Sequence, residues 1–226
     1  MSFSAELREL TAATWAEAVH HRFVEELWRG ELAPDVLTRY LVQDYQFVDA
    51  FVALLGATVA ASDRADTRLV LARQLGTLAG PENDFFARAF DALGVPDAAR
   101  DHPELAEPTR GFIDLMNSAR RSADYPTCLA VLLVAEWLYL DWATRPGATL
   151  PEDRVQREWI ELHTGPAFTA WVDFLRAEFD RAGAQLDDTA RTSPRDAFVR
   201  AVDLELAFFA AAYEENPPAP TARRAR

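Results

Sequence analysis

The stretch from Tyr125 to Ala143, YPTCLAVLLVAEWLYLDWA, constrains the fold of this chain more than any other part of the sequence. Pro126 stands where the first turn of a helix tolerates proline, and the segment that follows it has no polar face. A helix that is apolar on nearly every side must be surrounded by other elements. The segment is also too short and too acidic to span a bilayer comfortably. We therefore predict that it is the central helix of the molecule.

Glu136 lies in the middle of this apolar segment. A lone carboxylate in such a place is costly unless it is hydrogen-bonded, paired with a cation or kept neutral by a raised pKa. One interpretation is a structural carboxylate that bonds to a neighbouring helix or to an ordered water. The other is a catalytic acid or base, because desolvation moves the pKa of a glutamate toward neutrality.

The rest of the chain has apolar residues at three- and four-residue spacing, with breaks at glycine and proline. No segment has the alternation of a β-strand, and no linker or repeat divides the chain. We therefore predict an all-α, single-domain helical bundle over residues 1–215 and a disordered C-terminal tail over residues 216–226. The expected helices are 4–20, 22–28, 35–62, 64–78, 82–93, 108–122, 125–143, 151–162, 166–182 and 193–213.

Two further carboxylates stand at apolar positions of predicted helices. Asp44 shares a face with Leu41 and Phe47, and Glu205 shares one with aromatic residues of the last helix. Together with Glu136 they are three carboxylates on the apolar faces of three helices. Such a set is better explained by a polar pocket inside a helical bundle than by three separate core acids, although a misread amphipathic pattern is the alternative.

Other chemistries find less support in the sequence. A di-iron bundle requires Glu-x-x-His pairs, and none of the four histidines follows a glutamate at that spacing. Cys128 has no histidine partner within sequence reach and is interpreted as a core residue. No glycine-rich phosphate loop stands between a strand and a helix. We therefore predict neither a metal nor a cofactor.

The net charge of −13 and the isoelectric point near 4.7 argue against a general nucleic-acid binder, because no basic stripe offsets the acidic balance. A single cysteine cannot form an internal disulfide, and the N-terminus does not read as a secretory leader. The prediction is a cytoplasmic protein that contacts neither nucleic acid nor membrane.

Two segments near the N-terminus resemble the opening of the TenA/thiaminase II family. They are HRFVEELWRGEL at residues 21–32 and YLVQDYQF at residues 40–47. The usual form of the family is H-P-F, then L-x-x-G-x-L, then Y-L-x-Q-D-Y. Weaker matches follow at residues 83–86 and 159–163, and at Glu205 with the phenylalanines after it. The resemblance covers most of the chain.

This resemblance implies an all-helical, haem-oxygenase-like fold, usually a homotetramer, that acts on aminopyrimidines from thiamin breakdown. In the better-known branch a cysteine in an L-P-C-x-W-x-Y segment is the nucleophile, the aspartate of Q-D-Y binds the pyrimidine, and a glutamate of the last helix handles protons. Here Ala135 stands at the position of that cysteine. The neighbouring Glu136 is similar to a branch that lacks the cysteine and uses a glutamate.

We therefore expect a hydrolase of amino- or formylamino-methylpyrimidine in thiamin salvage, acting as a dimer or tetramer. The alternatives are a cofactor-dependent or di-iron oxidase on the same fold and a non-catalytic pyrimidine-binding or regulatory protein. Phe112 and His163 replace tyrosines that are common in the family, and Arg22 replaces its proline, so these departures bear on the substrate. The expected catalytic residues are Glu136 and Glu205, and the expected substrate-binding residues are Asp44, Phe47, Phe112, Tyr139, His163 and Phe208.

Overall fold

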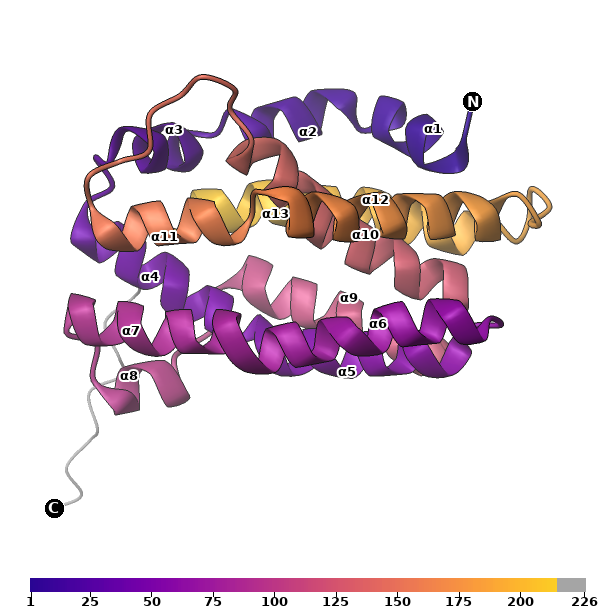
Figure 1. Ribbon diagram of the computed structural model, residues 1–226, viewed down its shortest axis with the longest axis horizontal. Coiled ribbons are helices and arrows are strands. Elements are labelled where there is room, and N and C mark those ends of the chain that lie inside the picture. The colour runs from indigo at the N-terminus through magenta and orange to yellow at the C-terminus, as the bar shows by residue number, and fades with distance from the viewer. Residues whose placement is uncertain (215–226) are drawn as a thin grey trace, which may run out of the picture.

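The computed structural model describes residues 1–214, which form helices and no strand (Figure 1). The all-α prediction is therefore confirmed for this part of the chain, whereas the predicted disorder of 216–226 lies outside the described residues. The helices are α1 Phe3–Leu10, α2 Ala12–Val19, α3 Arg22–Arg29, α4 Pro34–Tyr45, α5 Phe47–Ala61, α6 Ala65–Thr77, α7 Asn83–Leu93, α8 Asp97–Asp101, α9 Glu107–Ser122, α10 Tyr125–Ala143, α11 Arg154–Leu162, α12 Pro166–Gly183 and α13 Thr192–Ala211, with a π-helical turn η1 at Leu78–Glu82.

Helix α10 is the central helix, as its composition predicts. Its N-terminus is capped by Asp124, whose carboxylate accepts a hydrogen bond from the backbone N–H of Thr127 at 3.1 Å. Residues 128–134 are fully buried. The helix packs against α2, α5, α9, α12 and α13, so neighbours cover it on all sides. This enclosure is what a helix without a polar face requires.

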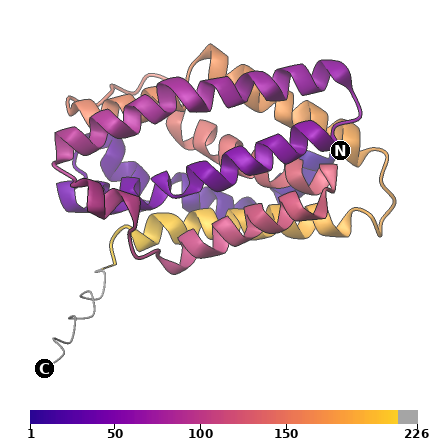
Figure 2. The ribbon, with the colours of Figure 1, turned by 90° about the horizontal axis from the view of Figure 1, so that it is seen from below.

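The other helices form layers around α10. Figure 1 shows α1 to α3 along one side of the molecule, α11 to α13 through its middle, and α5 to α7 along the opposite side. Helices α9 and α13 lie side by side, as Figure 2 shows. Helix α13 also packs against α10, and α4 packs against α5 and α7.

Two stretches are long and apolar enough to cross a bilayer by length and composition alone, Pro34–Ala61 and Tyr125–Ala143. The most apolar window of the second stretch is 78% buried inside the protein. Its hydropathy is therefore that of a core helix.

Two predicted helices are interrupted. The predicted helix 4–20 breaks at Thr11. The carbonyl of Leu7 accepts from both the hydroxyl of Thr11 at 2.9 Å and its backbone N–H at 3.0 Å, an arrangement that often bends a helix. The predicted helix 35–62 breaks at Gln46. The amide of Gln46 donates to the carbonyl of Arg100 at 2.9 Å and so ties this break to the connection between α7 and α9. Neither contact is visible in the periodicity of the sequence.

Three predicted boundaries also differ. The expected loop between residues 94 and 107 contains the short helix α8. The expected stop at Gly80 and the proline after it is spanned by η1, which leads directly into α7. Helix α11 begins at Arg154 rather than at residue 151, because Asp153 is its N-cap and accepts from the backbone N–H of Gln156 at 2.9 Å.

Candidate functional site

A cavity lies inside the bundle where α4, α5, α9, α10, α11 and α13 meet. It encloses about 570 Å³ free of protein atoms, its open mouth included. Apolar side chains form most of its wall, and a few polar groups converge on it, as in sites for small molecules. The lining residues are Asp44, Phe47, Val48, Phe51, Leu78, Phe112, Met116, Ala135, Glu136, Tyr139, Trp159, His163 and Glu205.

The three carboxylates singled out in the sequence all line this cavity. Asp44 comes from α4, Glu136 from α10 and Glu205 from α13, and their residues are 9%, 7% and 2% exposed. Each stands on the buried face of its helix, as the three- and four-residue spacing implies. The structure therefore brings the three acids to one place, while their catalytic roles stay a prediction.

Glu205 has the most perturbed environment of the three. Burial raises its pKa well above the ordinary value of 4.5, and the negative charges of Asp44 and Glu136 raise it further. Among the described residues, no hydrogen bond reaches its carboxyl group. Glu205 therefore keeps its proton at pH values where an ordinary glutamate is ionised.

Glu136 is held by a neighbour from α12. The indole Nε1–H of Trp171 donates to Oε1 of Glu136 at 2.8 Å, inside the protein. This bond fixes the orientation of the carboxylate at the cavity wall. Trp171 is a partner that the sequence analysis missed, because it occupies an ordinary apolar position of a helix and no pattern marks it.

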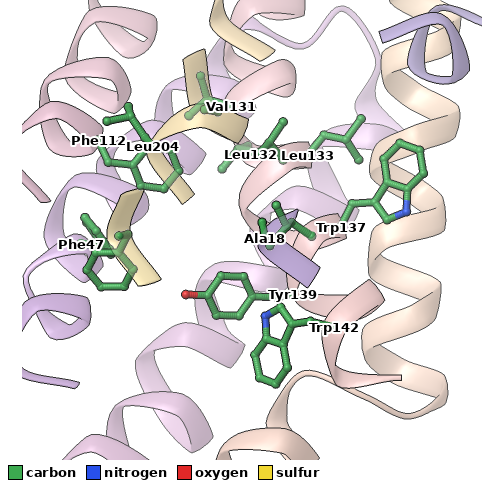
Figure 3. Packing of buried hydrophobic residues seen from close by; sticks show 14 of the residues in the cluster. Ala18, Phe47, Phe112, Val131, Leu132, Leu133, Trp137, Tyr139, Trp142 and Leu204 are labelled. Carbon is green, nitrogen blue, oxygen red and sulfur yellow. The ribbon is translucent and has the colours of Figure 1, made fainter. Parts of the chain in front are cut away.

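Asp44 belongs to a chain of buried hydroxyl groups. The hydroxyl of Tyr139 donates to Oδ1 of Asp44 at 3.3 Å, and the hydroxyl oxygens of Tyr139 and Tyr40 are 2.6 Å apart. Tyr139 projects from α10 toward the side on which Phe47 and Phe112 lie (Figure 3). The expected substrate-binding residue Tyr139 thus presents both its ring and its hydroxyl group to the site.

His163 follows the end of α11 and is neutral. Its Nδ1 lies 2.8 Å from the carbonyl oxygen of Trp159, which can only accept, so Nδ1 carries the proton. Burial lowers the pKa of His163 to about 4. Its Nε2 is then an acceptor, which makes His163 a polar acceptor at the cavity wall.

Phenylalanines form part of the apolar wall. Phe47 and Phe112 both line the cavity and meet edge to face with ring centroids 5.4 Å apart. Phe208 lies one layer further out, with its ring 4.9 Å from that of Phe47, and it lines a neighbouring cavity between α4, α13 and the α7–α9 connection. The structure thus gathers seven of the eight predicted site residues at the cavity and places Phe208 behind them.

Trp137 is an aromatic residue of α10 whose side chain points away from the cavity. It projects from the side of α10 opposite to Tyr139 (Figure 3). There its ring packs against Trp15 at 5.1 Å, and the guanidinium of Arg176 lies 4.3 Å from its centroid. Trp137 is therefore not among the described residues that line this cavity.

Cys128 lies in the core outside this cavity. It is fully buried, and its thiol donates to the carbonyl of Ala119 at 3.3 Å. Burial raises the pKa of the thiol to about 11. Its environment is that of a core residue. Within residues 1–214 no group of three or more histidine, cysteine, aspartate or glutamate side chains is arranged to hold a metal ion.

The arrangement is suited to proton transfer. It combines a carboxyl group that retains its proton, a carboxylate oriented by an indole N–H, and acceptors at Asp44 and His163. Groups of this kind act as general acid and general base on a bound ligand. The flat aromatic walls of the cavity favour a planar ring.

One curated protein and several solved structures are similar to this chain in sequence or in fold. The curated aminopyrimidine aminohydrolase of Bacillus subtilis (strain 168) is 24% identical over 218 residues, covering 96% of this chain and 92% of that protein. A TenA homologue from Pyrococcus furiosus superposes with a TM-score of 0.84 at 18% identity, covering 93% of this chain and 100% of its own. A protein described as a TenA family transcription regulator from Silicibacter sp. TM1040 superposes with a TM-score of 0.80 at 22% identity, covering 92% and 95%.

These likenesses give the fold, which is the haem-oxygenase-like all-α fold of TenA homologues. The match to a family is independent of the superposition. The model of the TENA/THI-4/PQQC family matches residues 9–215. This chain therefore belongs to the TENA/THI-4/PQQC family.

Proposed function

We propose that this protein is a hydrolase of aminopyrimidines in thiamin salvage, acting on an amino- or formylamino-methylpyrimidine. The Bacillus subtilis relative carries the name aminopyrimidine aminohydrolase, and the family match covers nearly the whole chain. The residues at the cavity are compatible with that reaction class. The catalytic groups are carboxylates, because Ala135 stands on the cavity wall where the better-known branch has its cysteine.

The protein is expected to recognise the flat pyrimidine ring of the substrate and the polar groups at its edge. The pyrimidine ring stacks among Phe47, Phe112 and Tyr139, which supply apolar area with defined orientation. Asp44 accepts hydrogen bonds from the amino group of the ring edge, a charge-assisted contact that strengthens when water is excluded. His163 offers Nε2 as a further acceptor for an N–H of the substrate.

The chemistry divides between the two glutamates. Glu136 takes a proton from water, and the water oxygen forms a bond to the exocyclic methylene carbon. The carbon–nitrogen bond breaks, and Glu205 donates its proton to the departing nitrogen. The products from an aminomethylpyrimidine are the hydroxymethylpyrimidine and ammonia. This assignment is supported by the raised pKa of Glu205 and by the indole N–H that orients Glu136.

The observation that carries the proposal is the meeting of three carboxylates from three helices in one apolar cavity. A stability role alone does not require such an arrangement, since like charges in a low dielectric repel. An acid–base pair acting on a bound ring does require it.

The test is to incubate the purified protein with aminomethylpyrimidine, formylaminomethylpyrimidine and thiamin in parallel. Mass spectrometry follows the pyrimidine products, and coupled assays follow ammonia and formate. We expect turnover of at least one pyrimidine and none of thiamin, with the products identifying the broken bond. The loss of turnover in Asp44→Asn, but not in Asp63→Asn on the surface, would place the reaction in this cavity. Failure of the folded protein to convert either pyrimidine would contradict the proposal.

We also propose that the chain assembles as a dimer or tetramer. Helix α5 belongs to a stretch that is apolar enough for a core helix, yet only 28% of its most apolar window is buried. Val52 on α5 is 38% exposed and Leu69 on the neighbouring α6 is 71% exposed. Light scattering of the purified protein is expected to give an oligomer that Val52→Glu weakens, and a monomer for the unmodified chain would contradict this.

A further inference from the structure

The hydrogen-bonded tyrosine pair behind the cavity extends beyond the residues that line it. Tyr40 is 1% exposed and stands on α4, one helical turn before Asp44. Its hydroxyl oxygen lies 2.6 Å from that of Tyr139, and the hydroxyl of Tyr139 lies 3.3 Å from Oδ1 of Asp44. Tyr40 is not among the described residues that line the cavity, and its hydrogen bond to the site runs through Tyr139.

The direction of the hydrogen bonds follows from the number of protons. A carboxylate only accepts, so the single hydroxyl proton of Tyr139 points to Asp44. The hydroxyl of Tyr40 must then donate to the oxygen of Tyr139, because no other proton lies between the two oxygens. Burial raises the pKa of both phenols well above their ordinary value of 10, so both keep these protons.

A phenol that accepts a hydrogen bond becomes a better donor, so the bond from Tyr40 strengthens the bond from Tyr139 to Asp44. The ring of Tyr40 is held in place by Phe23 at 4.2 Å and by Phe208 at 5.1 Å between centroids. The hydroxyl of Tyr40 is therefore fixed in position before any ligand arrives.

We propose that Tyr40 is a positioning residue that, through Tyr139, fixes Asp44 as an ionised hydrogen-bond acceptor and leaves the shared proton of the carboxylate cluster on Glu205. The expected effect of Tyr40 on substrate turnover rests on the proposed function, whereas its expected effect on the titration of Asp44 does not.

Besides Tyr40 on its own helix, the described charged and titratable groups that line the cavity with Asp44 come from three other helices or their ends. They are Glu136 and Tyr139 on α10, His163 at the end of α11, and Glu205 on α13. Helices α5 and α9 contribute only apolar side chains to the lining, which are Phe47, Val48, Phe51, Phe112 and Met116. Among these groups, Tyr139 gives its proton to Asp44, while no hydrogen bond within residues 1–214 reaches Glu205. The proton of the cluster therefore resides on Glu205.

The test uses Tyr40→Phe, which keeps the ring and removes only the hydroxyl. The matched control is Tyr45→Phe on the same helix, because the hydroxyl of Tyr45 makes no hydrogen bond within the described part of the chain. Carbon-13 NMR of protein labelled at the aspartate carboxyl groups follows the titration of Asp44, with its signal assigned by Asp44→Asn. This measurement requires neither substrate nor activity.

In Tyr40→Phe we expect the pH midpoint of the Asp44 signal to rise by about half a unit to one unit, as the loss of one hydrogen bond implies. Tyr45→Phe leaves the midpoint unchanged. In a Tyr139→Phe background the further change Tyr40→Phe has no added effect, because the chain is already broken. An unchanged midpoint in folded Tyr40→Phe, or an equal shift in Tyr45→Phe, would overturn the proposal.

Turnover provides the second measurement. If the wild type converts an aminomethylpyrimidine, Tyr40→Phe is expected to raise KM by about 5- to 10-fold with a smaller change in kcat, because Asp44 acts in binding. A change in kcat alone would contradict the positioning role. If the wild type converts no pyrimidine, the proposed function fails, and the NMR titration still decides the role of Tyr40.

Discussion

Two buried glutamates, Glu178 and Glu205, are nearly equal in burial and opposite in surroundings. Glu178 on α12 is 6% exposed, accepts from the hydroxyl of Tyr125 at 2.8 Å, and accepts from the guanidinium of Arg181 at 2.6 and 2.9 Å. Glu205 on α13 is 2% exposed, faces two other carboxylates across a cavity, and receives no hydrogen bond from the described residues. The buried carboxylate of Glu178 is thus paired with a cation and hydrogen-bond donors, as in a structural ion pair, whereas the carboxyl group of Glu205 faces a cavity.

The greatest loss of activity is expected when the acidic group of Glu205 is removed without a change of side-chain shape. Glu205→Gln is expected to lower kcat/KM for the pyrimidine substrate by about 10²- to 10⁴-fold, the usual contribution of a general acid. Glu178→Gln is expected to leave kcat/KM unchanged and to lower the free energy of unfolding. Steady-state kinetics measures the activity of both variants, and urea unfolding measures their stability. Equal losses of activity in the two variants would contradict the different roles of Glu205 and Glu178.

The same pair differs in the pH dependence of stability. The pKa of Glu205 is raised in the folded state above its ordinary value of 4.5. Its contribution to stability is then fully present below pH 4.5 and is lost as the pH rises, because only the unfolded chain ionises readily. Glu205→Gln is therefore expected to gain stability relative to the wild type as the pH rises from 4.5, measured by urea unfolding at several pH values.

The next effect concerns the cation beside Glu178. Arg181→Met leaves that buried carboxylate without its charge partner and is expected to lower the free energy of unfolding by about 3 kcal/mol. Arg181 also bonds to Asp63 at 2.7 Å, which joins α12 to the end of α5. The double variant with Glu178→Gln is expected to lose less than the sum of the two single changes. A strictly additive loss in urea unfolding would show that the pair is not coupled.

His163 extends the comparison from buried acids to a buried base. Burial lowers its pKa from 6.5 to about 4, so the folded protein resists protonation that the unfolded chain accepts. The stability that His163 contributes is present above pH 6.5 and is lost as the pH falls toward 4, by up to about 3 kcal/mol. His163→Phe is expected to remove this part of the pH dependence. Unfolding curves of equal pH dependence for both proteins would contradict the lowered pKa.

The smallest expected effect is at Cys128. Cys128→Ser is expected to leave turnover unchanged and to cost about 1 kcal/mol of stability, because a hydroxyl replaces a thiol in an apolar place. In the folded wild type the thiol is expected to resist iodoacetamide, since its pKa is raised to about 11 and it is buried. Inactivation by iodoacetamide without unfolding would indicate that Cys128 is catalytic and would contradict a mechanism that uses carboxylates alone.

Residue periodicity accounts for much of the fold and for the position of the acids. The absence of a polar face on Tyr125–Ala143 predicted the central helix, and α10 is enclosed as expected. The spacing that put Asp44 and Glu205 on apolar faces also put them on the cavity wall. Both features depend on the local period of a helix, which a sequence displays directly.

Contacts between distant segments could not be predicted in this way. The break at Gln46 depends on a bond to the backbone of Arg100, and the orientation of Glu136 depends on Trp171. Tyr40 stands on the same face as Asp44, one turn earlier, and this was the available indication that it belongs with the site. Its link to Tyr139 joins residues 99 positions apart and appears only when the helices are packed.

Infrared spectroscopy of the substrate-free protein at pH 7 distinguishes a neutral from an ionised Glu205. We expect a carbonyl stretch of a protonated carboxyl group that disappears in Glu205→Gln and persists in Glu178→Gln. Spectra in which Glu205→Gln removes only a carboxylate band would show that Glu205 is ionised and cannot supply the proton.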